Sequence, residues 1–276
     1  MDIIQVITDE LKVQKWQVEA AVKLIDEGCT IPFISRYRKE ATGSLNDEQL
    51  RTLHERLLYL RNLEDKKNQV LTSIEEQGKL TPELKKQILD AKTLVVVEDL
   101  YRPYRPKRRT RAIIAKEKGL EPLANIIMLQ MTKKPLEEEA KAFLSEEKGV
   151  ETVEDALNGA KDILAETISD EADYRIYIRD LTMKKGSVAS AAKKPEESSV
   201  YEMYYEFEEP IKKLAGHRVL ALNRGEKEKI LTVKVNAPEE EILGWLQKQV
   251  LAKDNPITTP VLREVVEDSY KRLIAP

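Results

Sequence analysis

The feature that most constrains the fold is a run of leucines between residues 50 and 74. Its apolar residues are spaced three and four apart and share one helical face: Leu50, Leu53, Leu57, Leu60, Leu71 and Ile74. This spacing predicts one long amphipathic helix over about residues 46–77, capped at its N-terminus by Asn46 or Ser44 and ended by Gly78. Glu64 and Lys67 interrupt the apolar face. A coiled-coil seam rarely tolerates both, so we expect a long helix that packs on several neighbours.

Most of the remaining chain has the same helical spacing. Charged residues make up 34% of the chain and aromatic residues 5%, while glycine and proline are sparse, as is typical of helical proteins. Residues 94–100 (LVVVEDL) fit either a helix or a buried strand, and their helical surroundings favour a helix. The other predicted helices cover residues 2–12, 15–27, a segment starting at Thr81, and residues 111–118, 121–131, 135–145, 153–185, 238–253 and 260–273.

Two stretches depart from this pattern. Residues 184–199 (KKGSVASAAKKPEESS) are small and polar, which marks them as the best candidate for a domain boundary. Residues 217–236 fit two strands around a turn at Arg224-Gly225-Glu226, a β-hairpin. The predicted fold is therefore mainly α, a multi-helix scaffold with one small β-hairpin in the C-terminal third. The predicted domains are residues 1–190 and 191–276.

Composition excludes several classes of site. Cys29 is the single cysteine, so an internal disulfide framework is impossible and a reducing, cytoplasmic setting is expected. His54 and His217 are the only histidines, too few for an ordinary zinc site. No glycine-rich phosphate-binding motif and no paired acid–base carboxylates are recognisable, and no apolar run is long enough to span a membrane. We expect no cofactor, no metal, no membrane association and no enzymatic activity.

The most basic segment of the chain is LYRPYRPKRRTR, residues 100–111. It contains no acidic residue and six cations: Arg102, Arg105, Lys107, Arg108, Arg109 and Arg111. In one interpretation these cations contact nucleic-acid phosphates, Tyr101 or Tyr104 stacks on bases, and the prolines fix an extended backbone. In the other, the segment is a proline-stiffened connector whose cations pair with glutamates of nearby helices. Because the net charge of the chain is −3, any nucleic-acid site must be a local patch of this kind.

Two further stretches carry clustered charge. TIPFISRYRKE contains Arg36, Arg38 and Lys39 beside Phe33 and Tyr37, and fits a second part of a basic surface or a packed junction with internal ion pairs. We favour the structural role, since arginine pairs readily with carboxylates. Farther along, residues 196–209 hold six glutamates and no cation, whereas residues 211–235 hold seven cations against two glutamates.

Several stretches together resemble a known family. IPFISRYRKEATGSL, RTLHERLLYLRNLEDKK, LYRPYRPKRRTRA, GLEPLA, HRVLALNRGE and DSYKRLIAP are similar, in order, to the N-terminal region of the bacterial Tex family of transcription accessory proteins. The resemblance implies a mostly helical scaffold with helix-turn-helix character. It also implies that a ribonuclease-H-like domain, helix-hairpin-helix modules and an OB-type RNA-binding domain follow in the family, beyond the last residue of this sequence. Arg102 and Arg105 stand where the family has leucine and lysine, so this segment is unusually basic.

Two hypotheses follow. In the first, the chain is a non-enzymatic scaffold that contacts RNA or DNA near RNA polymerase, weakly in this part alone, through Arg102 to Arg111, helped by Arg36, Arg38 and Lys39. In the second, the chain is a protein-interaction scaffold that docks polymerase or another factor, and the domains that follow in the family bind all the nucleic acid. Salt dependence separates the two, because phosphate contacts weaken steeply with salt and an apolar protein interface does not.

Overall fold

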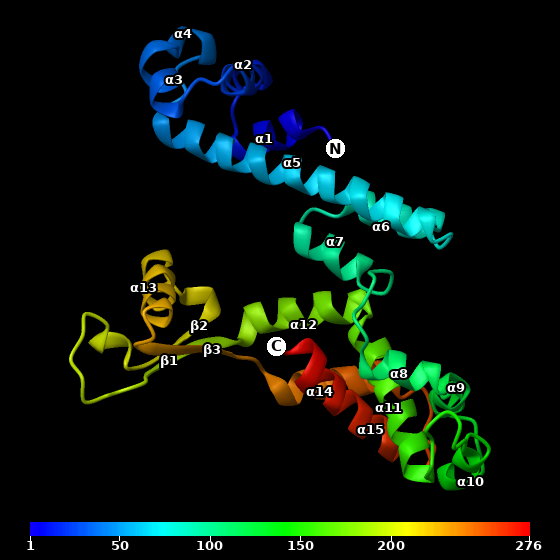
Figure 1. Cartoon of the computed structure of the whole chain (residues 1–276). Coiled ribbons are helices and arrows are strands. Elements are labelled where there is room, and N and C mark those ends of the chain that lie inside the picture. The colour runs from blue at the N-terminus through cyan, green and yellow to red at the C-terminus, as the bar shows by residue number, and fades with distance from the viewer. The chain divides into compact units, whose positions relative to one another are not determined.

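The computed structural model describes all residues, 1–276. The chain forms two compact units, Met1–Tyr104 and Arg105–Pro276, and each is described here by itself. The structure is mainly helical, with a small three-stranded antiparallel sheet in the C-terminal third, which confirms the predicted fold class (Figure 1).

The first unit consists of helices alone. Residues 94–100, which the sequence left open between helix and strand, are helical, as favoured. Thr93 begins that helix by accepting a hydrogen bond on its side chain from the backbone N–H of Val96. The helices are α1 (Ile3–Leu11), α2 (Lys15–Asp26), α3 (Ile31–Tyr37), α4 (Lys39–Thr42), α5 (Asp47–Glu76), α6 (Pro82–Asp90) and α7 (Leu94–Tyr101).

Helix α5 is the predicted long helix and the centre of the first unit. Asn46 caps its N-terminus in a capping box with Gln49. The helix contacts α1, α2, α3, α6 and α7, so its apolar face is shared among several neighbours rather than one partner helix. The predicted apolar face is buried, apart from half-buried Leu71. Leu63 and Val70, which the prediction did not include, are buried with it.

Lys67 fills the gap in this apolar face. Its side chain is 1% exposed, and its Nζ donates a 2.7 Å hydrogen bond to the backbone oxygen of Leu89, in the last turn of α6. The same ammonium lies 3.4 Å from Oε1 of Glu64, an ion-pair distance. Carbonyls at a helix C-terminus lack intrahelical partners and carry partial negative charge, so a buried cation there stabilises the helix end.

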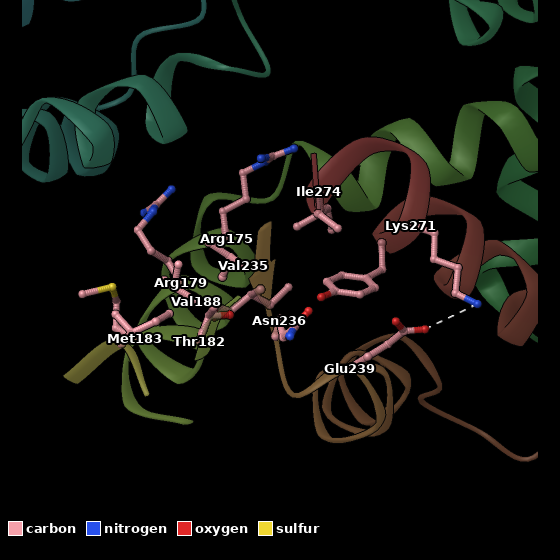
Figure 2. A pocket seen from close by; sticks show the side chains of 15 residues that line it. Arg175, Arg179, Thr182, Met183, Val188, Val235, Asn236, Glu239, Lys271 and Ile274 are labelled. Atoms are coloured by element: carbon pink, nitrogen blue, oxygen red, sulfur yellow. Dashed lines mark hydrogen bonds and ion pairs between the residues drawn. The ribbon is translucent and has the colours of Figure 1, made fainter. Parts of the chain in front are cut away.

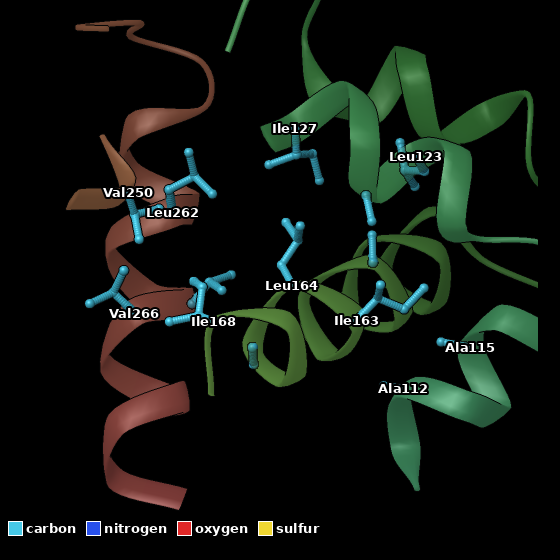
Figure 3. Packing of buried hydrophobic residues seen from close by; sticks show 14 of the residues in the cluster. Ala112, Ala115, Leu123, Ile127, Ile163, Leu164, Ile168, Val250, Leu262 and Val266 are labelled. Atoms are coloured by element: carbon cyan, nitrogen blue, oxygen red, sulfur yellow. The ribbon is translucent and has the colours of Figure 1, made fainter. Parts of the chain in front are cut away.

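The second unit is built around α11. This helix contacts α8, α9, α10, α15 and the final π-helix η3. Figure 3 shows Leu164 and Ile168 of α11 extending toward Ile127 of α9 and Val266 of α15. The helical elements of this unit are α8 (Arg111–Glu117), α9 (Glu121–Leu129), α10 (Leu136–Lys141), α11 (Val153–Ser169), α12 (Ala172–Lys185), α13 (Gly216–Lys227), α14 (Glu239–Val250), α15 (Thr259–Asp268), η1 (Glu202–Tyr204), η2 (Ile211–Lys213) and η3 (Ser269–Ile274).

The sheet lies in the second unit, with α13 beside it (Figure 1). Its strands are β1 (Ser187–Ala192), β2 (Glu206–Pro210) and β3 (Leu231–Asn236), in the order β2-β1-β3. Both pairings are antiparallel, with Ser190 opposite Phe207 on one side and Val233 on the other. The small, polar stretch 184–199 was the best candidate for a domain boundary in the sequence. Residues 187–192 within it form the central strand of the sheet.

The predicted hairpin over residues 217–236 was half wrong. Residues 231–236 form a strand as expected, but residues 216–227 form helix α13. Gly225 was interpreted as a turn residue, yet it is buried in the last turns of the helix, where an added Cβ would lie 2.6 Å from Cδ1 of Leu231. The glycine therefore allows close helix–strand packing. The chain reverses at Lys229, whose φ of 62° is left-handed.

The predicted continuous helix over residues 153–185 was also wrong in one respect, because it is broken between Ser169 and Ala172. No glycine or proline marks the break. Tertiary contacts hold it instead: Nε of Arg175 donates to the backbone oxygen of Ser169, and Lys107 pairs with Asp170.

The hydrophobic core of the second unit includes residues from Ala112 to Tyr270. Helices on both sides of residue 190 contribute to it. The division into domains at residue 190 stays a prediction, as does the helix-turn-helix character, whose candidate helices α8 and α9 meet at Gly119.

Candidate nucleic-acid interface

The basic segment begins at the C-terminus of α7. Arg102 is the C-terminal cap of that helix, and the N–H of Tyr104 donates to the backbone oxygen of Tyr101, forming a turn. The Tyr101 hydroxyl hydrogen-bonds with the hydroxyl of Ser73 at 2.9 Å, and Tyr104 is half-buried, its backbone oxygen bound by Gln77. Both tyrosines therefore have structural contacts, unlike the exposed stacking rings that one interpretation required.

Lys107 anchors the segment to α11. Its Nζ lies 2.9 Å from Oε1 of Glu166 and also pairs with Asp170. Burial raises the pKa of the Glu166 carboxyl, but the hydrogen bonds from Lys107 and Thr110 outweigh it, so the net pKa is lowered. The carboxylate is thus held charged against the ammonium. For Lys107 the geometry matches the ion-paired connector interpretation.

The other cations of the segment lie at the surface to different degrees. The guanidinium of Arg109 pairs with Glu117 at 2.9 Å, with both side chains exposed. Arg111 is the first residue of α8 and lines a cleft of about 200 Å³ together with Asp155 and Asp162. Arg105 is exposed and has interactions of its own, whereas Arg108 is exposed and has no hydrogen bond or ion pair. The predicted set therefore divides into an anchor, paired cations and a solvent-facing cation.

The second predicted group lies on α3 and α4 of the first unit. Arg38 pairs with Glu40 at 3.3 Å, while Arg36 and Lys39 are exposed. Phe33 is 43% exposed and Tyr37 67% exposed, and their ring centroids are 5.5 Å apart. Only Ile34 of this stretch is fully buried. The favoured packed-junction interpretation therefore fits Arg38, but the aromatic rings and the other two cations form an exposed basic and aromatic surface.

A third group of cations surrounds α13. Sequence reasoning noted the excess of positive charge in residues 211–235 but placed it on a hairpin and assigned it no role. In the structure, five exposed cations flank or lie on this helix: Lys212, Lys213, Arg224, Lys227 and Lys229. The charge count was the signal that could have identified them.

A cleft of about 720 Å³ in the second unit lies between α12, the ends of β1 and β3, and η3 (Figure 2). Arg175 donates to the backbone oxygens of Ser169 and Leu273, and Lys271 pairs with Glu239 and Glu267. Burial raises the pKa of the Tyr270 hydroxyl, so this group stays neutral at ordinary pH. Arg175 and Lys271 are thus held by neighbouring groups of the second unit.

No group of three or more histidine, cysteine, aspartate or glutamate side chains lies close enough to hold a metal ion. None of the helices combines the length and the apolar character needed to cross a membrane.

These features define a class: a mainly helical protein with exposed basic surfaces on a scaffold of long helices. Comparison with protein families places it further. Residues 1–75 match the Tex-like protein N-terminal domain, and residues 130–269 match the Tex central region-like family. The chain belongs to the Tex family, which confirms the resemblance found in the sequence.

Individual relatives agree with this assignment. The uncharacterized protein YdcI of Bacillus subtilis is 48% identical over 99% of this chain, and the transcriptional accessory protein Tex of Neisseria gonorrhoeae is 42% identical over 84%. The human S1 RNA-binding domain-containing protein 1 is 32% identical over the whole chain. The matches span 38%, 31% and 29% of these three relatives, so the chain corresponds to about a third of their length.

Proposed function

We propose that this chain is a non-enzymatic, cytoplasmic scaffold of a transcription accessory factor that holds nucleic acid near RNA polymerase. One relative is named a transcriptional accessory protein and another an S1 RNA-binding domain-containing protein, which supports a role connected with nucleic acid. The long helix of the first unit and the buried hydrophobic cluster of the second unit support a scaffold.

One observation carries the proposed contact: Lys107 holds the basic segment against Glu166 and Asp170, while neighbouring cations face solvent. An anchored loop loses less conformational freedom on binding than a flexible one. In this proposal Lys107 positions the loop, and Arg105, Arg108, Arg109 and Arg111 contact phosphates. Arg102 supports the loop from the end of α7.

The exposed surface of the first unit supplies a second contact in this proposal. Arg36 and Lys39 neutralise phosphates, while Phe33 and Tyr37 offer exposed ring faces on which unpaired bases stack. Arg38, held by Glu40, contributes less. A basic groove with aromatic rings is the usual arrangement for binding single strands without sequence preference.

The test is fluorescence anisotropy of a labelled single-stranded RNA with the full chain at low and physiological salt. The variant Arg108→Ser/Arg109→Ser removes two loop cations, and Lys133→Ser/Lys134→Ser removes two exposed cations elsewhere as a matched control. We expect the loop variant to bind the RNA several-fold more weakly. The slope of log affinity against log salt concentration should fall in magnitude by one to about two, because each lost phosphate contact lowers it by about 0.9 or less. Equal binding by both variants, or no binding at low salt, would refute the contact.

A second function is favoured by a different observation. Trp16, Phe33 and Tyr37 are each more than 40% exposed in the first unit, and exposed aromatic side chains are common in protein interfaces. This supports a protein-interaction scaffold that docks polymerase or another factor. Binding of purified polymerase that persists at high salt and is lost in Phe33→Ser/Tyr37→Ser would favour this function over nucleic-acid contact.

A further inference from the structure

The cations around α13 are not neutralised by the fold. Lys212, Lys213, Arg224, Lys227 and Lys229 are exposed, and none has an ion pair. Arg218 is the exception, because it pairs with Glu209 at 3.0 Å and lies over the ring of Phe207. This concentration of unpaired positive charge belongs to no site described above.

The cations of α13 share the outer side of the helix. His217, Leu220, Arg224 and Lys227 follow at intervals of three, four and three residues, which places them along one face. The opposite face carries the buried residues Leu222 and Gly225, which pack toward Leu231 of β3. The sheet therefore supports α13 from one side and leaves its basic side open.

The two glutamates within residues 211–229 do not cancel this face. Glu226 lies on a flank of the helix, about 100° around the axis from Lys227. Glu228 hydrogen-bonds with the side chain of Tyr201. Residues 211–229 thus keep an excess of positive charge, with six cations and two glutamates.

We propose that α13 and its flanking lysines bind the groove of duplex nucleic acid. A helix with its side chains is about 10–12 Å across, and the major groove of B-form DNA is about 12 Å wide. Lys212 and Lys213 stand before the helix, and Lys227 and Lys229 stand at its end. A helix inserted in the groove places these two groups near the phosphates of the two strands.

The middle of the helix suits the floor of such a groove. Leu220, which is 69% exposed, lies between the basic ends, and Asn223 is exposed nearby. An apolar side chain contacts thymine methyl groups there, and an asparagine hydrogen-bonds with adenine. A small apolar centre with cations at both ends is a better match to a groove than to a flat acidic surface.

A single strand is a poorer match for this surface. Base stacking needs exposed aromatic faces, and the aromatic side chains of this subregion are engaged. Tyr201 and Tyr204 are buried, and the ring of Phe207 is covered by Arg218 and packs on Tyr204. An acidic protein segment matches the positive charge of this surface but not its apolar centre. Binding of a poly-glutamate peptide distinguishes this occupant from a duplex.

This inference goes beyond the proposed loop contact and shares no residue with it, so either can fail alone. The test measures anisotropy of a labelled 20-base-pair duplex, the matching single strand and a labelled poly-glutamate peptide with the full chain. The variant Lys213→Ser/Arg224→Ser/Lys227→Ser is compared with Lys133→Ser/Lys134→Ser/Lys141→Ser, which removes three exposed cations from another part of the second unit. Thermal unfolding of each variant checks that the fold is retained.

We expect the α13 variant to lose about tenfold or more in duplex affinity, and its salt slope to fall by two to three. The control should stay within about twofold of the original chain. The substitution Leu220→Glu, at an exposed position, should also abolish duplex binding, because it places an anion in the groove. Losing single-strand binding to the same extent would contradict the preference for a duplex.

Four other results would overturn the proposal. Equal weakening by the control would show that bulk charge is responsible. Loss of peptide binding with unchanged duplex binding would identify an acidic protein segment as the occupant. Unchanged duplex binding in Leu220→Glu would place the duplex elsewhere on the chain. Loss of duplex binding in Arg108→Ser/Arg109→Ser, with unchanged binding in the α13 variant, would support the loop contact and reject α13 as the duplex site.

Discussion

Two segments of this chain carry the same number of cations and differ in what the fold does with them. Residues 102–111 and residues 212–229 each contain six. The first segment has no acidic residue and the second has two, so by sequence the first is the more basic. In the structure Lys107 and Arg109 of the first segment are paired with carboxylates, whereas in the second only Arg218 is paired.

The difference arises from residues far away in the sequence. Glu166 and Asp170, which hold Lys107, lie 59 and 63 residues from it. Local charge density therefore predicts where cations are, but tertiary neighbours decide which are available to a ligand. A held cation contributes to stability, and an unpaired one contributes to binding. The predictions below test that division.

The most strongly held cation is Lys67, in the first unit. The change Lys67→Met should lower the free energy of unfolding by about 3 kcal/mol, because it removes the ammonium from the Leu89 carbonyl and leaves the Glu64 carboxylate with only the N-terminal ammonium of Met1 as its cation. The control Lys85→Met, at an exposed position of α6, should change it by less than about 0.5 kcal/mol. Urea denaturation measures both, and equal stability of the two variants would contradict a structural role.

Lys107 provides the same test within the second unit. Lys107→Met should lower the free energy of unfolding by about 1–2 kcal/mol, less than for a fully buried pair because the side chains keep some solvent contact. Lys227→Met, in the unpaired group, should change it by less than about 0.5 kcal/mol. If the two substitutions had equal effects on stability, the distinction between held and unpaired cations would be wrong.

The helical periodicity could be predicted from the sequence. The features that could not be predicted have physical causes. The apolar face of α5 and the cap at Asn46 could be predicted because both are local patterns. The burial of Lys67 could not, since the carbonyl that binds it belongs to α6. The same holds for the break after Ser169, which depends on Arg175 and Lys107.

Helix α13 and strand β1 show two further limits. The apolar residues of RVLALN fit a strand or a helix. Gly225 was interpreted as a turn residue, because its close packing against Leu231 is a tertiary contact that the sequence does not show. The small residues of β1 gave no strand signal, because a strand paired on both sides needs no bulky side chain to hold its place. Of the candidate site, the cations were predictable, but the sequence left open which of them pair with carboxylates.

The stability of the Lys107 anchor should depend on pH. The pKa of the Glu166 carboxyl in the folded protein is lowered from its usual value of 4.5. The charged carboxylate therefore stabilises the fold fully above pH 4.5, and this stabilisation is lost as pH falls through the lowered pKa. In Lys107→Met the ammonium is gone, so burial raises the pKa of Glu166. Protonation of Glu166 at low pH then stabilises the folded state of this variant. The gap in unfolding free energy between the two proteins should therefore narrow from pH 7 to pH 3, and a constant gap would refute the coupling.

The smallest expected effects compare one arginine from each segment. Arg109 is paired with Glu117, but both side chains are more than half exposed, so the ion pair is screened and contributes about 0.5 kcal/mol or less. Arg109→Ser and Arg224→Ser should thus both shift the unfolding temperature by no more than about 2 °C. Their duplex affinities should differ, because only Arg224 is unpaired and faces the proposed groove. A thermal scan and an anisotropy titration on the same samples measure both quantities, and a larger loss of duplex affinity for Arg109→Ser would reverse the assignment of roles.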